Sequence, residues 1–88
     1  EYTYLGIING QNNEGLYGLE QRNKFSVGET IEVMKPDGRD LSVNVLRICD
    51  EEGSDMESCP HPKQRIYVDL GIELSDQDLL RRAEKTDD

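Results

Sequence analysis

The sequence has no apolar run near the roughly 18 residues that a membrane-spanning helix needs. It also lacks a signal-like N-terminus and any Asn-Xaa-Ser/Thr glycosylation site. These absences argue against membrane insertion and secretion, so we expect a cytoplasmic protein with no membrane partner. No initiator methionine is present, and residues 1–5 already have the composition of a strand. We therefore expect a domain that belongs to a longer chain.

Large apolar residues are also scarce. Leu, Ile, Val and Phe number 21 of 88 residues, about 24%, just above the roughly 20% below which disorder becomes the default. A chain this short buries little more than about 60% of the surface that its unfolded form exposes. We expect one compact domain over residues 1–83, with residues 84–88 as a frayed tail.

Basic residues are few. Nineteen acidic residues against ten basic ones give a formal net charge of −9, and such a chain is repelled by a phosphate backbone unless its basic side chains cluster. Five of the acids fall within residues 50–57 and two more end the chain. The remainder leaves room for a local basic edge toward a substrate or RNA, made of Arg22, Lys24, Lys63, Arg65, Arg81 and Arg82.

The stretch from Glu20 to Val33 has the pattern of a barrel corner. Gly28 supplies a backbone kink, and Ile31 and Val33 then alternate with Glu32 and Met34 at the period of a strand. The polar residues 20–24 could form a binding edge, although a solvated loop entering a strand is the more general pattern. We therefore expect this stretch to have a structural role and not a catalytic one.

Short strands with turn residues between them fill the rest of the chain. The first strand is apolar on both faces, so we expect it to be buried on both, and its Gly6 indicates a bend or a close backbone approach. Pro36-Asp37-Gly38 predicts a tight turn, and 50–58 is expected to be an exposed loop. The strands are expected at 2–9, 16–21, 29–35, 41–49 and 64–70.

Two segments are less regular. Apolar positions are odd from Leu41 to Val45 but even at Leu46 and Ile48, and this change of phase predicts a β-bulge within one strand. Residues 75–83 have the form of a helix cap followed by an apolar stripe, which on periodicity alone predicts a helix. The overall pattern is typical of an all-β fold, a small closed or half-closed antiparallel barrel.

Three side chains could act as soft metal ligands or nucleophiles, namely Cys49, Cys59 and His61. A closed zinc site normally needs four ligands, and the paired Cys-Xaa-Xaa-Cys spacing is missing. A disulfide is disfavoured in a reducing compartment. A catalytic pair of Cys59 and His61 lacks an evident orienting group or oxyanion donor. The acidic loop 50–57 does not match an EF-hand loop. We expect neither a metal nor a catalytic residue.

Four parts of the sequence resemble the C-terminal domain of the collagenase-like peptidases of family U32. They are Tyr4-Leu5-Gly6, the run from Glu20 to Glu29, Pro60 to Gln64, and Asp78 to Arg82, which together cover nearly the whole chain. Cys59 departs from the family pattern. The motif residues that carry the resemblance, for which we expect structural roles, are Glu20, Gln21, Asn23, Phe25, Val27, Gly28, Pro60, His61 and Pro62.

The resemblance implies a β-barrel like the second domain of translation GTPases, placed after a larger catalytic domain. In the family, that preceding domain holds the active site and, in several members, a cysteine-bound iron–sulfur cluster. Some members act as peptidases and others in hydroxylation of tRNA or ribosomal RNA. The resemblance also implies that residues 78–82 form the last strand after a turn at 75–77, and we adopt this strand in place of the helix.

Two functions remain open at this point. One is a non-catalytic accessory domain, a lid or substrate-positioning barrel whose partners are the catalytic domain of its own chain and a protein substrate. The other is an RNA-binding barrel that acts through the basic edge. Both predict that this part of the chain is not an enzyme on its own, holds no cofactor and is a monomer.

Overall fold

The computed structural model describes residues 2–58 and 63–83, and in this part of the chain all regular structure is β. None of these residues forms a helix long and apolar enough to cross a membrane. The strands are β1 (Tyr2–Gln11), β2 (Tyr17–Glu20), β3 (Thr30–Met34), β4 (Asp40–Asn44), β5 (Arg47–Cys49), β6 (Asp55–Met56), β7 (Arg65–Asp69) and β8 (Leu79–Ala83). The predicted all-β class is confirmed, with eight strands where six were expected.

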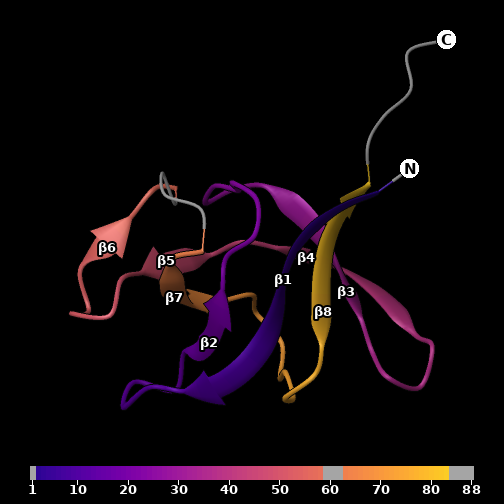
Figure 1. Ribbon diagram of the computed structural model, residues 1–88, viewed down its shortest axis with the longest axis horizontal. Coiled ribbons are helices and arrows are strands. Elements are labelled where there is room, and N and C mark those ends of the chain that lie inside the picture. The colour runs from indigo at the N-terminus through magenta and orange to yellow at the C-terminus, as the bar shows by residue number, and fades with distance from the viewer. Residues whose placement is uncertain (1, 59–62, 84–88) are drawn as a thin grey trace, which may run out of the picture.

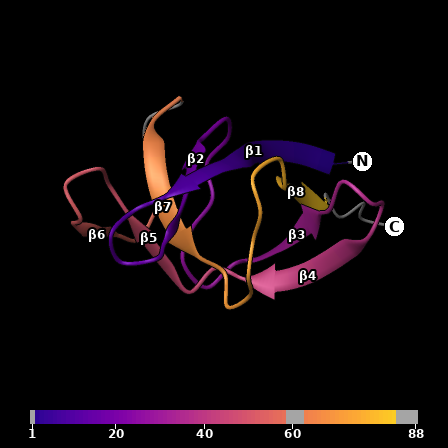
Figure 2. The same ribbon diagram turned by 90° about the horizontal axis from the view of Figure 1, so that it is seen from below.

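The strands form one antiparallel sheet in the order β4-β3-β8-β1-β2-β7-β5-β6. Figures 1 and 2 show that this sheet curls into a half-open barrel, with β4 and β6 at its two ends. One apolar core fills the concave side. Its members are Leu5, Ile8, Leu19, Phe25, Ile31, Val33, Val43, Val45, Ile48, Ile66, Val68, Leu70, Leu74 and Leu80.

The segment between β2 and β3 is a corner, as its sequence predicts, and it joins the two ends of the sheet. The Val27 N–H donates to the Glu57 carbonyl just after β6 (2.8 Å), and the Gly28 N–H donates to the Val45 carbonyl just after β4 (2.8 Å). Ser26 and Ser58 form a β-bridge beside them. Gly28 has a φ of 90°, which favours glycine, so the predicted kink is confirmed.

A carboxylate at the corner ties this segment to β8. Glu29 accepts a hydrogen bond from the Ser26 N–H (3.0 Å) and another from the Arg82 guanidinium. Partial burial would raise the pKa of Glu29, but the two hydrogen bonds and the charge of Arg82 outweigh that effect and lower it. Arg82 also donates to the Lys24 carbonyl (2.6 Å), so the corner is held from both its ends.

Strand β1 changes its inward face at Gly6. The register against β8 shifts between Tyr4 and Gly6, so Leu5 and Ile8 are both buried while Tyr4 is exposed. A Cβ at Gly6 would lie 2.5 Å from Leu19 Cδ1 and 2.8 Å from the Glu20 carbonyl oxygen. The predicted bend and close approach are confirmed. The inference that this strand is buried on both faces is wrong. The bulge shifts the inward positions from odd to even residue numbers, so a strand with one buried face has apolar residues at both kinds of position.

The predicted single strand 41–49 is instead two strands at opposite ends of the sheet. β4 pairs with β3, while β5 pairs with β6 and β7. Between them, the Val45 N–H donates to the Glu29 carbonyl (2.9 Å) and the Leu46 N–H to the Asp69 carbonyl (2.9 Å). The change of phase in the sequence therefore marks a chain that leaves one end of the sheet for the other, and the predicted bulge is wrong.

The turns follow the sequence more closely. The Lys35 N–H donates to the Arg39 carbonyl (2.8 Å), and Gly38 has a φ of 93°, so the predicted tight turn is confirmed. The Gly and Asn residues at 10–15 predict a hairpin loop, and this loop is present, although β1 continues to Gln11. The segment 50–58 is only partly a loop, because Asp55 and Met56 pair with β5 as a short strand.

The last segment is a strand after a turn, as the family resemblance implied, and the helix predicted from periodicity is wrong. The Asp78 N–H donates to the Ser75 carbonyl (3.0 Å), and the Asp78 carbonyl accepts from the Ile8 N–H (2.8 Å). The fully buried Asp78 carboxylate accepts from Lys35 Nζ (2.5 Å) and from the Ser75 N–H (2.9 Å). This buried ion pair fastens the turn to the end of β3.

The Glu29 contacts predict a pH dependence of stability. The folded-state pKa of Glu29 lies below its unfolded value, so its contribution is full above the ordinary glutamate range and is lost as pH falls through the lowered value. The variant Glu29→Gln should therefore show a smaller fall in unfolding free energy between about pH 5 and pH 2. Denaturant unfolding across this range measures it. The control is the exposed variant Glu51→Gln. If the unfolding free energy changes with pH equally in Glu29→Gln, Glu51→Gln and the wild type, the assignment is wrong.

The Lys35–Asp78 pair predicts a large effect of removing one partner. Lys35→Met leaves a buried carboxylate without its cation and should lower the unfolding free energy by about 3 kcal/mol. Adding Asp78→Asn should recover part of that loss. Arg39→Met breaks the exposed Arg39–Asp37 pair and should change the unfolding free energy much less. Chemical denaturation measures both variants. If Lys35→Met and Arg39→Met lower the unfolding free energy by similar amounts, the buried pair has no special role.

Candidate functional site

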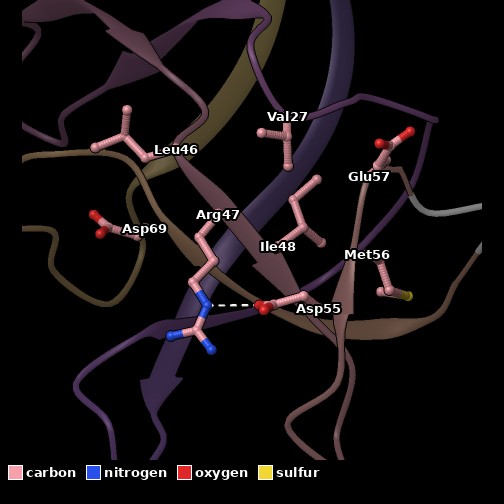
Figure 3. Close-up of a pocket in the computed structure, with 8 residues that line it drawn as sticks. All are labelled: Val27, Leu46, Arg47, Ile48, Asp55, Met56, Glu57 and Asp69. Atoms are coloured by element: carbon pink, nitrogen blue, oxygen red, sulfur yellow. Dashed lines mark hydrogen bonds and ion pairs between the residues drawn. The ribbon is translucent and has the colours of Figure 1, made fainter.

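A hollow of about 460 Å³ opens beside the β5–β6 hairpin (Figure 3). Four of its lining residues are apolar and four are charged: Val27, Leu46, Ile48 and Met56, and Arg47, Asp55, Glu57 and Asp69. Val27 and Leu46 are among the most exposed large apolar side chains of the described chain, at 41% and 55%. We call this feature the β5–β6 hollow. Its size and mixed lining are typical of a binding surface.

The fold itself makes this hollow. Val43 and Val45 are buried, so Leu46 faces outward in the same alternation, and the chain crosses to β5, where Ile48 is buried again. Val27 is exposed at the corner where its backbone is bonded to Glu57. Met56 lies on the two-residue edge strand β6. Residues far apart in sequence thus come together where the two ends of the sheet meet.

An ion pair lies along the rim of the β5–β6 hollow. Arg47 Nε donates to Asp55 Oδ1 (2.7 Å), and Arg47 Nη1 lies 3.7 Å from Glu14 Oε2. The hydrogen bond from Arg47 lowers the pKa of Asp55, and the bond from the Cys49 thiol lowers it further. Asp55 is therefore a fixed carboxylate that closes the hairpin.

The neighbouring thiol is not activated. Cys49 is fully buried, and its Sγ donates to Asp55 Oδ1 (3.2 Å). Burial raises the pKa of the Cys49 thiol, and its hydrogen bond to the carboxylate raises it further. A nucleophilic cysteine needs the opposite shift. In residues 2–58 and 63–83, no three His, Cys, Asp or Glu side chains gather as a metal site.

A second hollow, of about 310 Å³, is lined by Ser26, Val27, Glu57 and Ser58. It shares Val27 and Glu57 with the β5–β6 hollow. We call these two adjoining hollows together the β6 groove. Two hollows that share a wall offer neighbouring positions to successive residues of a bound chain segment.

The six predicted basic residues are mostly engaged with other groups. Arg81 donates to Glu32 (2.9 Å) and lies over the Tyr2 ring at 3.6 Å, whereas Arg82 is bound to Glu29. Arg65 donates to the Asn9 carbonyl (2.7 Å) and lies near the Tyr67 ring.

The remaining three lie around the corner. Arg22 forms an exposed pair with Glu20 (2.9 Å), Lys24 is exposed next to Arg82, and the exposed Lys63 donates its N–H to the Gln21 carbonyl. Arg81 and Arg82 are consecutive in a strand and point to opposite faces. The structure therefore gathers Arg22, Lys24, Lys63 and Arg82 near the corner but separates Arg81 from them.

The predicted motif residues of the corner have structural partners. Phe25 and Gln21 are buried, Asn23 Nδ2 donates to the Tyr4 carbonyl (2.7 Å), and Glu20 pairs with Arg22. Cys59, Pro60, His61 and Pro62 lie outside the described residues, as does the tail 84–88. Sequence reasoning missed the β5–β6 hollow, and Leu46, apolar but out of phase with Val43 and Val45, was the signal that could have indicated it.

Comparisons with known proteins agree on the family. Residues 1–81 match the family model of the peptidase family U32 C-terminal domain. The crystal structure of the C-terminal domain of a Geobacillus thermoleovorans protein assigned to U32 peptidases superposes with a TM-score of 0.79 at 24% identity, covering 93% of each chain. Its selenomethionine variant gives a TM-score of 0.77 at 25% identity, over 90% of this chain and 98% of that one.

A curated relative is much longer. The tRNA hydroxylation protein P1 of Bacillus subtilis (strain 168) is 24% identical over 83 residues, which are 93% of this chain. The chain spans only 20% of that protein's length. The similarity therefore concerns one domain of a larger protein.

The rim contacts predict the titration of Asp55. Arg47→Gln removes the guanidinium and should raise the pKa of Asp55 toward that of an ordinary aspartate. Side-chain carboxyl NMR titration of Asp55 measures this shift. Arg39→Gln, at an exposed pair elsewhere, is the control and should leave Asp55 unchanged. An Asp55 titration that is the same in Arg47→Gln and the wild type would refute the assignment.

Proposed function

The chain belongs to the peptidase family U32 C-terminal domain family, and on that premise we propose that it is a non-catalytic accessory domain. It helps a catalytic part of the same protein to hold and position a macromolecular substrate. The observation that carries the proposal is the contrast between a well-formed binding hollow and the lack of activated groups in the described chain. Reacting groups and any cofactor lie elsewhere in the protein.

The chemistry of the described side chains supports this reading. The Cys49 thiol is buried and held protonated by its surroundings. The buried Asp78 carboxylate is bound to Lys35 and to the backbone of its own turn, so it is committed to structure. General acid–base or nucleophilic catalysis requires a group that can reach a substrate and change its protonation state. Exposed apolar side chains instead favour binding.

The substrate is either a protein or an RNA. The family is named for peptidases, whereas the curated relative is named for tRNA hydroxylation. Direct RNA binding by this domain is the alternative function, through the basic residues at the corner. The net charge of −9 and the carboxylate partners of Arg22, Arg81 and Arg82 disfavour it. We therefore favour a protein-facing domain.

The test is to delete residues 1–83 from the full-length protein and to assay both tRNA hydroxylation and cleavage of an unfolded collagen-like peptide. Loss of substrate positioning should raise KM by about tenfold, with a smaller change in kcat. Unchanged kcat and KM in the active assay would overturn the accessory function.

A second measurement separates the RNA alternative. Amide NMR spectra of the 88-residue chain are recorded while transfer RNA is added, in the wild type and in the double variant Lys24→Glu with Lys63→Glu. The favoured function predicts no shifts. Shifts around the corner in the wild type that disappear in the variant would establish RNA binding instead. Any binding that the variant keeps should then depend less on salt than wild-type binding.

A further inference from the structure

The apolar floor of the β6 groove is exposed in a molecule with few large apolar residues. Leu46 is 55% exposed and Val27 41% exposed, although the chain carries only 21 large aliphatic and phenylalanine residues in all. Both side chains lie within one hollow together with Met56. Apolar side chains that gather on a surface, with a polar rim around them, mark interaction sites. Met56 adds a flexible side chain that adapts to different apolar anchors.

The rim gives the partner its charge. Three carboxylates and one guanidinium line the β5–β6 hollow, and the guanidinium is already bound to Asp55 and lies near Glu14. Asp69 uses one oxygen to accept from the Gly71 N–H (2.9 Å). The exposed Glu57 side chain lines both hollows. The groove therefore complements a positive partner.

We propose that the β6 groove binds an extended basic polypeptide segment, in which an apolar anchor such as leucine or methionine is flanked by lysine or arginine. The anchor contacts Val27, Leu46 and Met56, and the flanking cations face Glu57 and Asp69. This inference rests on the proposed accessory function, because it names the surface by which the domain takes hold of a protein. The excess of carboxylates excludes a nucleic-acid backbone as the occupant of this groove.

Two kinds of interaction contribute differently. Burial of the anchor supplies most of the affinity, since apolar surface removed from water is the main favourable term. The rim carboxylates supply selectivity for charge and a dependence on salt. A partner with the anchor but acidic flanks is repelled, and a basic partner without the anchor gains little.

The experiment uses three synthetic peptides and the 88-residue chain. The probe is Lys-Arg-Gly-Leu-Gly-Arg-Lys, and the controls are Lys-Arg-Gly-Ser-Gly-Arg-Lys and Glu-Asp-Gly-Leu-Gly-Asp-Glu. Amide NMR titration should show shifts at Val27, Leu46 and Met56 with the probe, and much weaker ones with either control. Shifts spread over the acidic loop 50–53 with both basic peptides alike would overturn the inference, because they indicate charge attraction without a groove.

Matched variants test the residues. Leu46→Ser should weaken binding of the probe by about tenfold, and Glu57→Lys by about threefold or more with a smaller salt dependence. Tyr2→Ser removes an equally exposed apolar side chain outside the groove, at 57%, and Glu73→Lys reverses an exposed acid outside it. These controls should change binding less than twofold. Equal losses in the groove variants and the controls would refute the site.

The outcome can be separated from that of the accessory function. If the peptides do not bind but deletion of residues 1–83 still raises KM in the full-length protein, the accessory function stands and the β6 groove inference fails. If the probe binds as expected and the deletion leaves kcat and KM unchanged, the groove is a binding site and its proposed role in positioning a substrate is wrong.

Discussion

A two-residue connection constrains the whole molecule. β4 ends at Asn44 and β5 begins at Arg47, yet these strands lie six places apart in the order of the sheet. Six strand spacings span about 29 Å in a flat sheet, whereas the extended chain from Asn44 to Arg47 reaches only about 11 Å. The sheet must therefore curl until its ends approach each other. The corner at residues 26–29 then bonds to both ends, and Glu29 with Arg82 adds a tie to the central strand β8.

The candidate site follows from the same constraint. Where the two ends of the sheet meet, strand pairing is incomplete, because β6 is only two residues long and the corner contacts the residues just after it by a single bridge and one backbone bond. Side chains at such a junction cannot all turn inward. Leu46 and Val27 therefore remain at the surface, whereas Val45 and Ile48, which flank Leu46 in the sequence, are buried. Closure of the barrel and exposure of an apolar surface are two results of one geometry.

Local sequence patterns predicted the turns, the corner and the fold class. Pro36 restricts the backbone to a turn conformation, and Gly28 and Gly38 adopt the positive φ that favours glycine. They could not separate β4 from β5, because a bulge and a strand that crosses to another part of the sheet produce the same change of phase at Leu46. Periodicity also misread residues 79–83, where Leu79, Leu80 and Ala83 fit a helix as well as a strand, and the family resemblance decided correctly. The β5–β6 hollow escaped prediction because its lining comes from four separate segments.

The pairing of β1 with β8 has a mechanical consequence. Tyr2 lies opposite Ala83 at the end of an antiparallel ladder, so the chain enters and leaves the fold side by side (Figure 1). A force that pulls these two ends apart acts across the ladder and loads its hydrogen bonds one at a time, rather than along the strands against all of them together. Tension applied to its termini therefore unzips the β1–β8 ladder, beginning at Tyr2 and Ala83. The domain should unfold at a lower force than a sheet whose terminal strands are loaded in shear.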